Sequence, residues 1–191
     1  MPAGPYDESI IEDQIAYYRA RAPEYDERRL ELNETVNEPE ITIETEPFDS
    51  ADARRLVAAL DAHLASRYPP EQRFGPNLKP QQLAPGLGTF VVARTDGRAV
   101  GCGAVRLLDR TTVEVKRMYV EPEQRGRGVA KKILRHLEGA GRGLGAERAV
   151  LETGIYQDEA IGLYRRAGYV QVECWGEYTT SPTSVCFEKM I

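Results

Sequence analysis

Two glycines alternate with two arginines between an apolar, strand-like stretch and a helix-like one. The run reads Arg125-Gly126-Arg127-Gly128, followed by Val129 and Ala130. Glycine permits positive φ and close approach of the backbone, so successive N–H groups can converge on an anion at the start of a helix. Guanidinium groups suit phosphate oxygens. The stretch therefore predicts a pyrophosphate site.

Other phosphate-binding motifs fit this run poorly. A P-loop requires Gly-Lys-Ser/Thr, and here Val129 and Ala130 follow the second glycine. A dinucleotide-binding fingerprint needs a third small residue and an acid about 20 residues further on, so Gly126 and Gly128 alone support it weakly. The glycines at 139–143 follow a helix and precede a strand, which is the reverse order. They predict a flexible connection.

Two segments resemble the GNAT N-acetyltransferase superfamily. Residues 125–130 have the form Arg/Gln-x-x-Gly-x-Gly/Ala of its acetyl-CoA-binding motif, and residues 160–169 are similar to its Ala-x-x-Leu-Tyr-x-x-x-Gly-Phe/Tyr block. The family often has Asn where Gln157 stands. The closest resemblance is to a group of bacterial single-domain enzymes, mostly of unknown substrate, with a Lys-Arg-Met-Tyr-Val strand, which is 116–120 here.

The resemblance implies acetyl-CoA as cosubstrate and assigns residues to it. The pantetheine arm is expected to pair with the backbone of 118–120, much as an added strand would. A backbone N–H near Val120 is expected to face the thioester carbonyl. The implied cofactor-binding residues are Met118, Tyr119, Val120, Arg125, Gly126, Arg127, Gly128, Val129, Ala130 and Gln157.

Three side chains are implied in catalysis. Tyr164 matches the family tyrosine that can protonate the leaving thiolate, although an aromatic core residue would look the same in the sequence. With a pKa near ~10.4, an alkylamine is almost entirely protonated at pH 7 and must lose a proton before it attacks. Glu114 and Glu152 are the candidates to accept it, each also interpretable as an exposed acid or as an ion-pair partner of Lys116 or Arg148. A chain of ordered water could serve instead.

The periodicity around these residues predicts an α/β protein. Apolar alternation and turn signals indicate strands at 41–45, 89–94, 99–107, 112–120, 149–153, 169–175 and 184–190, with a hairpin turn at Asp96-Gly97. Helices are expected from a cap at Asp49 or Ser50 to Pro69, from Val129 to about 138, and over 159–167, with a short helix near 79–83. The resemblance implies a mixed, mostly antiparallel sheet of about six to seven strands, with splayed central strands, flanked by helices.

Charge divides the chain of 191 residues unevenly. The net charge is −5, whereas residues 1–40 alone carry 11 acids against 4 bases, which leaves the remainder at +2. Residues 1–40 are predicted to be an acidic, weakly helical extension, and residues 41–191 the acetyltransferase domain. The extension could lie on the body or mediate a homodimer.

Composition also excludes several classes of function. No apolar run approaches the ~20 residues that cross a bilayer, and none follows Met1 as a signal peptide would, so a cytoplasmic protein is expected. The absence of a basic stripe argues against nucleic acid as a partner. With His63 and His136 as the chain's histidines, a metal site is not expected, and Cys102, Cys174 and Cys186 are predicted to be reduced thiols on strands.

These patterns favour an N-acetyltransferase that moves an acetyl group to a primary amine of a small molecule or peptide by direct attack. The alternative is a non-catalytic acyl-CoA-binding module. Trp175 and Tyr178 are open to two interpretations, as lining of an acceptor pocket or as core and interface packing.

Overall fold

The computed structural model describes residues 40–69, 72 and 78–191. The predicted acidic extension therefore lies outside the described residues, apart from Glu40. The strands and helices are β1 (Ile41–Thr45), α2 (Ala51–Ala65), β2 (Gly88–Thr95), β3 (Arg98–Leu107), β4 (Thr112–Val120), α3 (Val129–Gly143), β5 (Arg148–Gly154), α4 (Asp158–Arg166), β6 (Val170–Val172) and β7 (Ser184–Met190). Short 3₁₀ helices occupy Pro80–Leu83, Pro122–Gln124 and Gly176–Thr180.

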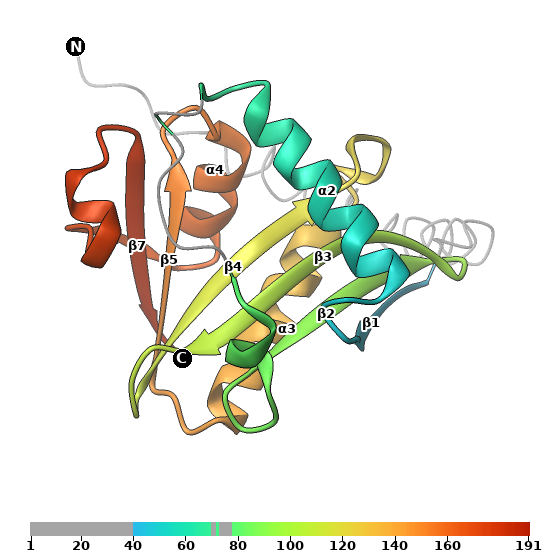
Figure 1. Cartoon of the computed structure of the whole chain (residues 1–191), viewed down its shortest axis with the longest axis horizontal. Coiled ribbons are helices and arrows are strands. Elements are labelled where there is room, and N and C mark those ends of the chain that lie inside the picture. The colour runs from blue at the N-terminus through green and yellow to red at the C-terminus, as the bar shows by residue number, and fades with distance from the viewer. Residues whose placement is uncertain (1–39, 70–71, 73–77) are drawn as a thin grey trace, which may run out of the picture. The chain divides into compact units, whose positions relative to one another are not determined.

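One seven-stranded sheet holds these elements together, in the order β1-β2-β3-β4-β5-β7-β6 (Figure 1). Every pairing is antiparallel except that of β4 with β5. That parallel pairing runs from Thr112↔Arg148 to Val115↔Leu151 and then ends, and the two strands diverge beyond it (Figure 1). The predicted mixed sheet with splayed central strands is thus confirmed, and the divergence opens the sheet at its centre.

Each face of the sheet is covered by a different helix. Successive side chains of a strand point to opposite faces. On β2, Val91 and Ala93 pack in the cluster that holds α3, whereas Phe90 and Val92 pack in the one that holds α2. Nearly continuous apolar strands such as β2 and β3 are therefore explained by burial on both faces.

Helix α3 is longer than predicted. The glycines at 139–143 were expected to form a loop, but the helix continues through Gly143. A Cβ at Gly141 would lie 2.8 Å from the Val113 side chain and 3.1 Å from that of Ile191. Close packing on the sheet thus requires a glycine here and outweighs its low helix propensity.

The prediction of reduced thiols on strands is confirmed for Cys102 of β3 and is wrong for Cys174 and Cys186. Cys174 and Cys186 form a disulfide, while Cys102 is a buried thiol whose pKa burial raises to about 12. The strand predicted over 169–175 ends at Val172, which pairs with Cys186, so Cys174 lies in the loop beyond it. Antiparallel pairing of β6 with β7 brings together two cysteines whose spacing in the sequence suggests no bond.

Reduction of this disulfide is expected to lower the free energy of unfolding by about 2–4 kcal/mol, because the bond restricts the unfolded chain. Thermal unfolding with and without dithiothreitol measures the effect. The Cys174→Ser variant should melt at the temperature of the reduced wild type and should not respond to the reductant. Equal melting temperatures for oxidised and reduced wild type would contradict the expectation.

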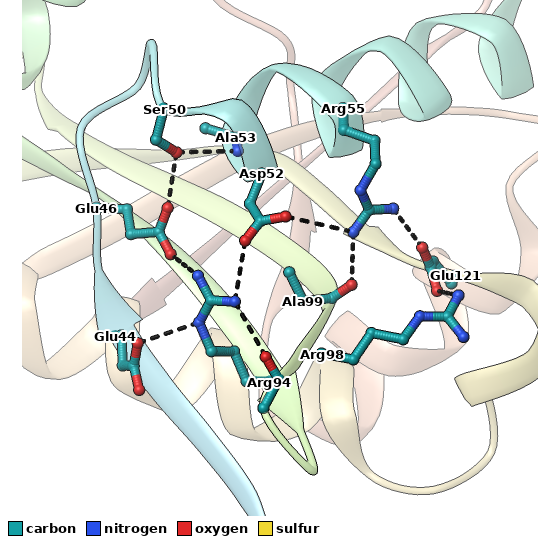
Figure 2. A network of polar contacts seen from close by, with 11 residues as sticks. Glu44, Glu46, Ser50, Asp52, Ala53, Arg55, Arg94, Arg98, Ala99 and Glu121 are labelled. Atoms are coloured by element: carbon teal, nitrogen blue, oxygen red, sulfur yellow. Dashed lines mark hydrogen bonds and ion pairs between the residues drawn. The ribbon is translucent and has the colours of Figure 1, made fainter.

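A network of ion pairs joins the start of α2 to β1 and β2 (Figure 2). Arg94 of β2 binds Glu44 at 3.1 Å, Asp52 at 2.9 Å, and also Glu46. Ser50 Oγ donates to Glu46 and accepts from the N–H of Ala53. Ser50 is therefore the N-cap of α2, for which the sequence suggested Asp49 or Ser50. The network fixes the helix that forms one wall of the site described next.

Candidate functional site

The predicted glycine loop has the shape of an anion cradle. Gly126 and Gly128 adopt φ of +77° and +80°, and a Cβ at either position would meet no atom within 4 Å. Helix α3 starts at Val129, directly after Gly128, and no described side chain caps it. Positive φ and an uncapped helix start leave backbone N–H groups available to an anionic ligand. The loop therefore fits the pyrophosphate expected from the sequence.

The two arginines of the loop lie in different surroundings. Arg125 Nε donates to the carbonyl of Val120 at 3.1 Å, and its Nη1 binds the Glu159 carboxylate at 3.2 Å. Arg127 is exposed, and its Nη1 donates to Gln124 Oε1 at 3.5 Å. Arg125 thus braces the loop against β4 and α4, while Arg127 projects into solvent, where a phosphate could bind.

Glu121 anchors the chain between β4 and this loop. Its buried carboxylate accepts from Arg55 at 2.5 Å and from Arg98 at 2.7 Å (Figure 2). Arg55 also donates to the carbonyl of Ala99 at 2.6 Å, and the N–H of Glu121 donates to Val100 at 2.9 Å. Contacts from α2 and β3 therefore fix the position where the loop leaves the sheet.

Strand β4 carries a β-bulge at its splayed end. Ala104 faces Lys116 and Cys102 faces Tyr119, so Arg117 and Met118 together oppose Gly103. Arg117 has φ of +58° and binds Asp61 of α2 at 2.6 Å. A bulge interrupts the strand ladder and redirects side chains. It occurs where the predicted pantetheine-binding residues 118–120 begin.

A cavity of about 570 Å³ lies where β4 and β5 separate. It is bounded by α2, β4, β5, α4 and the C-terminal segment. The predicted site residues on its wall are Glu114, Met118, Glu152, Gln157 and Tyr164. Residues that the sequence did not assign to the site also line it, among them Tyr68, Gln72, Lys116, Thr183 and Ser184. Tyr119, Val120 and residues 125–130 are not part of this wall.

Glu114 lies at the bottom of the cavity and is only 1% exposed. Arg106 binds it at 2.7 Å and Lys116 at 3.3 Å, while the hydroxyl of Tyr178 donates to it at 3.0 Å. Of its two alternative interpretations, the ion pair with Lys116 is confirmed and the exposed acid is wrong. Because three donors engage this carboxylate, it is poorly placed to accept a proton from an amine.

Glu152 offers a more available carboxylate on the opposite strand. Ser184 Oγ donates to it at 2.6 Å, and no described residue forms a salt bridge with it within 4 Å. Burial raises the pKa of Glu152, while the hydrogen bond from Ser184 and the charge of Lys116 oppose that rise. Arg148, its suggested partner, binds Glu188 instead. Glu152 is thus a partly desolvated carboxylate at the cavity wall.

Tyr164 reaches the cavity from α4 while its ring is packed in the core. The side chain is 5% exposed, with ring centroids 5.9 Å from Tyr169 and 6.2 Å from Phe187. Burial raises the pKa of its hydroxyl above the ordinary value for tyrosine, so it is protonated at neutral pH. The interpretation as an aromatic core residue is therefore confirmed, and the same residue also lines the cavity.

Tyr178 belongs to the cavity rather than to the core alone. Its hydroxyl accepts from Lys116 Nζ at 2.6 Å and donates to Glu114. Burial and the neighbouring Glu114 raise its pKa. Trp175 packs edge-on against it, with ring centroids 5.6 Å apart. Of the two residues suggested as pocket lining, Tyr178 therefore lines the cavity, and Trp175 is not among the residues of its wall. The sequence did not predict the contacts of Tyr178 with Glu114 and Lys116, which lie more than 60 positions away in the chain.

In the part of the chain that the structure describes, no helix has the length and hydropathy needed to span a membrane. Within the same residues, no cluster of three His, Cys, Asp or Glu side chains could hold a metal ion.

Comparison with known proteins gives consistent matches. The model of the acetyltransferase (GNAT) family matches residues 53–169. An IAA acetyltransferase of Azospirillum brasilense is 37% identical over 153 residues, which is 79% of this chain and 98% of that protein. The N-alpha-acetyltransferase RimI of Mycobacterium tuberculosis is 33% identical over 140 residues, 69% of this chain and 84% of that protein.

A solved structure described as an acyl-CoA N-acyltransferase from Klebsiella pneumoniae shares the fold. Its TM-score is 0.67 at 35% sequence identity, and the match covers 78% of this chain and 97% of that one.

Proposed function

Because this chain belongs to the acetyltransferase (GNAT) family and is an acetyl-CoA-dependent acyltransferase, we propose that it acetylates a primary amine by direct attack in a ternary complex. The observation that carries the proposal is the opening between β4 and β5. One cavity there holds the Glu152 carboxylate and the Tyr164 side chain, and β4 leads from it to the glycine cradle.

The C-terminal half of β4 and the loop after it would bind acetyl-CoA. The backbone of Gly126–Ala130 would hold the pyrophosphate of acetyl-CoA, with Arg127 beside it. Residues 118–120 would bind the pantetheine arm, and the N–H of Val120 would stabilise the negative charge that develops on the thioester oxygen. The acyl group to be transferred would then lie within the cavity.

Protons move between the substrates and two side chains. Glu152 accepts a proton from the ammonium group of the acceptor, so the amine nitrogen can form a bond to the acyl carbon. The carbon–sulfur bond breaks and Tyr164 donates its proton to the departing thiolate, while the second proton that the nitrogen loses on forming the amide returns to the Tyr164 oxygen. Glu114 is the alternative base, but its three donors suit it better to holding Lys116 and Tyr178 in place.

The Gly128→Asp variant tests the cradle. A carboxylate there would meet the pyrophosphate with like charge, and any side chain strains a backbone at φ of +80°. We expect the affinity for acetyl-CoA, measured by isothermal titration calorimetry, to fall by about 100-fold or more. Each factor of 10 in affinity corresponds to about 1.4 kcal/mol of binding free energy.

Gly145→Asp is the matched control, because Gly145 has φ of +89°, is exposed, and equally has no atom near its Cβ position. It should share the backbone strain and retain the affinity. Unchanged binding in Gly128→Asp, or equal loss in both variants, would refute the assignment of the cradle.

A further inference from the structure

We propose that the acceptor carries a carboxylate close to its amine, as a free amino acid does, and that Lys116 binds this carboxylate. The inference rests on the proposed function and names the class of acceptor for the same cavity. It follows from the balance of charge around Glu114 and from the unused bonding capacity of one ammonium group.

The polar cluster beneath the cavity contains more positive than negative charge. Arg106 and Lys116 both bind Glu114, at 2.7 Å and 3.3 Å, so two cations share one carboxylate. The next acid on the wall is Glu152, whose charge acts on Lys116 from across the cavity. Arg117 and Asp61, also on the wall, form a pair of zero net charge.

The proposed proton transfer leaves the positive charge of this cluster without a balancing negative charge. When Glu152 accepts the proton of the acceptor amine it becomes neutral, and the Arg106–Glu114–Lys116 cluster is left with a net positive charge. An isolated charge in a desolvated pocket is unfavourable. A carboxylate on the acceptor would neutralise it, whereas an amine without an anion would leave it uncompensated.

Lys116 is oriented to accept such a group. Its Nζ donates to the Tyr178 hydroxyl at 2.6 Å and to Glu114 at 3.3 Å, and lies 5.3 Å from the centroid of the Tyr178 ring. An ammonium group has three N–H donors. Among the described residues these two oxygens are the acceptors that the structure gives it, so one donor remains for a ligand. Burial lowers the pKa of Lys116, and contact with an anion would favour its charged form.

The same reasoning disfavours the terminal amine of a longer peptide. There the carboxyl group next to the amine is an amide and carries no charge. Such an acceptor would bring an ammonium group and no anion, so the net positive charge of the Arg106–Glu114–Lys116 cluster would stay unbalanced once Glu152 is protonated. Acetylation of peptide amines in preference to free amino acids is therefore a result that would overturn the proposal.

Matched acceptors test the proposal on the wild-type enzyme. Release of CoA is measured for each of the common amino acids, for its α-carboxamide, and for the decarboxylated amine. The acid should exceed its carboxamide in kcat/KM by about 10- to 100-fold for the preferred side chain, as loss of a charged hydrogen bond predicts. The carboxamide has the shape of the acid without its charge, so the ratio, corrected for the fraction of each amine that is neutral at the assay pH, reports the effect of that charge. A ratio near one would refute the proposal.

Variants then assign the effect to Lys116. In Lys116→Met the preference for acid over carboxamide should disappear, mainly through a raised KM for the acid. Lys116→Arg should retain part of it. Lys79→Met, which removes an exposed lysine outside the cavity wall, should leave the ratio unchanged. A preference that persists in Lys116→Met would overturn the role of Lys116, and if this variant fails to fold, the wild-type ratio still decides.

Failure of the inference is distinguishable from failure of the proposed function. If no amine of any class releases CoA above the rate of hydrolysis, amine acetylation itself is refuted. If amines are acetylated whether or not they carry a carboxylate, acetyl transfer stands and only the acceptor class is wrong.

Discussion

Tyr164→Phe is expected to lower kcat by about 10²- to 10⁴-fold, which is the usual contribution of a general acid. The substitution removes one hydroxyl from a side chain that otherwise remains packed against Tyr169 and Phe187. Without that proton donor, the thiolate of CoA must leave as an anion in a partly desolvated cavity. Affinity for acetyl-CoA, measured by calorimetry, should change little, because the cradle at 126–130 is distant in the chain and unaltered.

Tyr169→Phe provides the matched control for this variant. Tyr169 is a buried tyrosine in contact with Tyr164, but it does not line the cavity. Its loss of a hydroxyl should leave kcat within a few-fold of the wild type. Equal losses of turnover and cofactor affinity in Tyr164→Phe would indicate a structural role for Tyr164. Similar kcat values for the two variants would remove it from the mechanism.

The sequence predicted correctly those features that are determined by residues close together in the chain, such as strand bounds and the backbone angles of a glycine loop. β4 and β7 have the bounds that alternation indicated, and Gly126 and Gly128 have the positive φ that a glycine loop before a helix requires. The extent of α3 was missed because it depends on packing of Gly141 against Val113, a contact between residues distant in sequence. Propensity could not reveal it.

The cavity wall shows the same limit more clearly. Glu114 and Glu152 were equivalent candidates in the sequence, both acids on central strands. The fold distinguishes them, because Arg106 of β3 and Tyr178 of residues 176–180 converge on Glu114, whereas Ser184 is the one side-chain donor to Glu152 among the residues that the structure describes. These partners come from segments distant in the sequence, so the sequence alone could not distinguish the surroundings of the two carboxylates.

Glu152→Gln is expected to lower kcat/KM by about 10²- to 10⁴-fold at neutral pH, the range typical of general bases. Glutamine has the shape of glutamate and can still accept the hydrogen bond from Ser184. It cannot take a proton from the acceptor ammonium. If Glu114 or a water chain were the base, the loss would be less than about 10-fold, and Glu114→Gln would then be the more damaging substitution.

The pH profile separates a base from a merely polar contact. Burial raises the pKa of Glu152, so activity in the wild type should fall as pH decreases through a value above the ordinary one for glutamate. This fall in activity at low pH should be absent from the Glu152→Gln variant, whose pH dependence should reflect only the ionisation of the acceptor amine. Glu147→Gln, at an exposed acid before β5, should retain both the fall in activity at low pH and the rate.

Stability provides the independent readout for the same variant. The pKa of Glu152 is higher in the folded protein than in the unfolded chain, so ionised Glu152 disfavours folding once pH rises above both values. Glutamine carries no charge at any pH and removes that penalty. Glu152→Gln should therefore melt at a temperature equal to or above that of the wild type at neutral pH, while it loses activity. A variant that lost stability together with activity would show that Glu152 supports the cavity wall rather than the proton transfer.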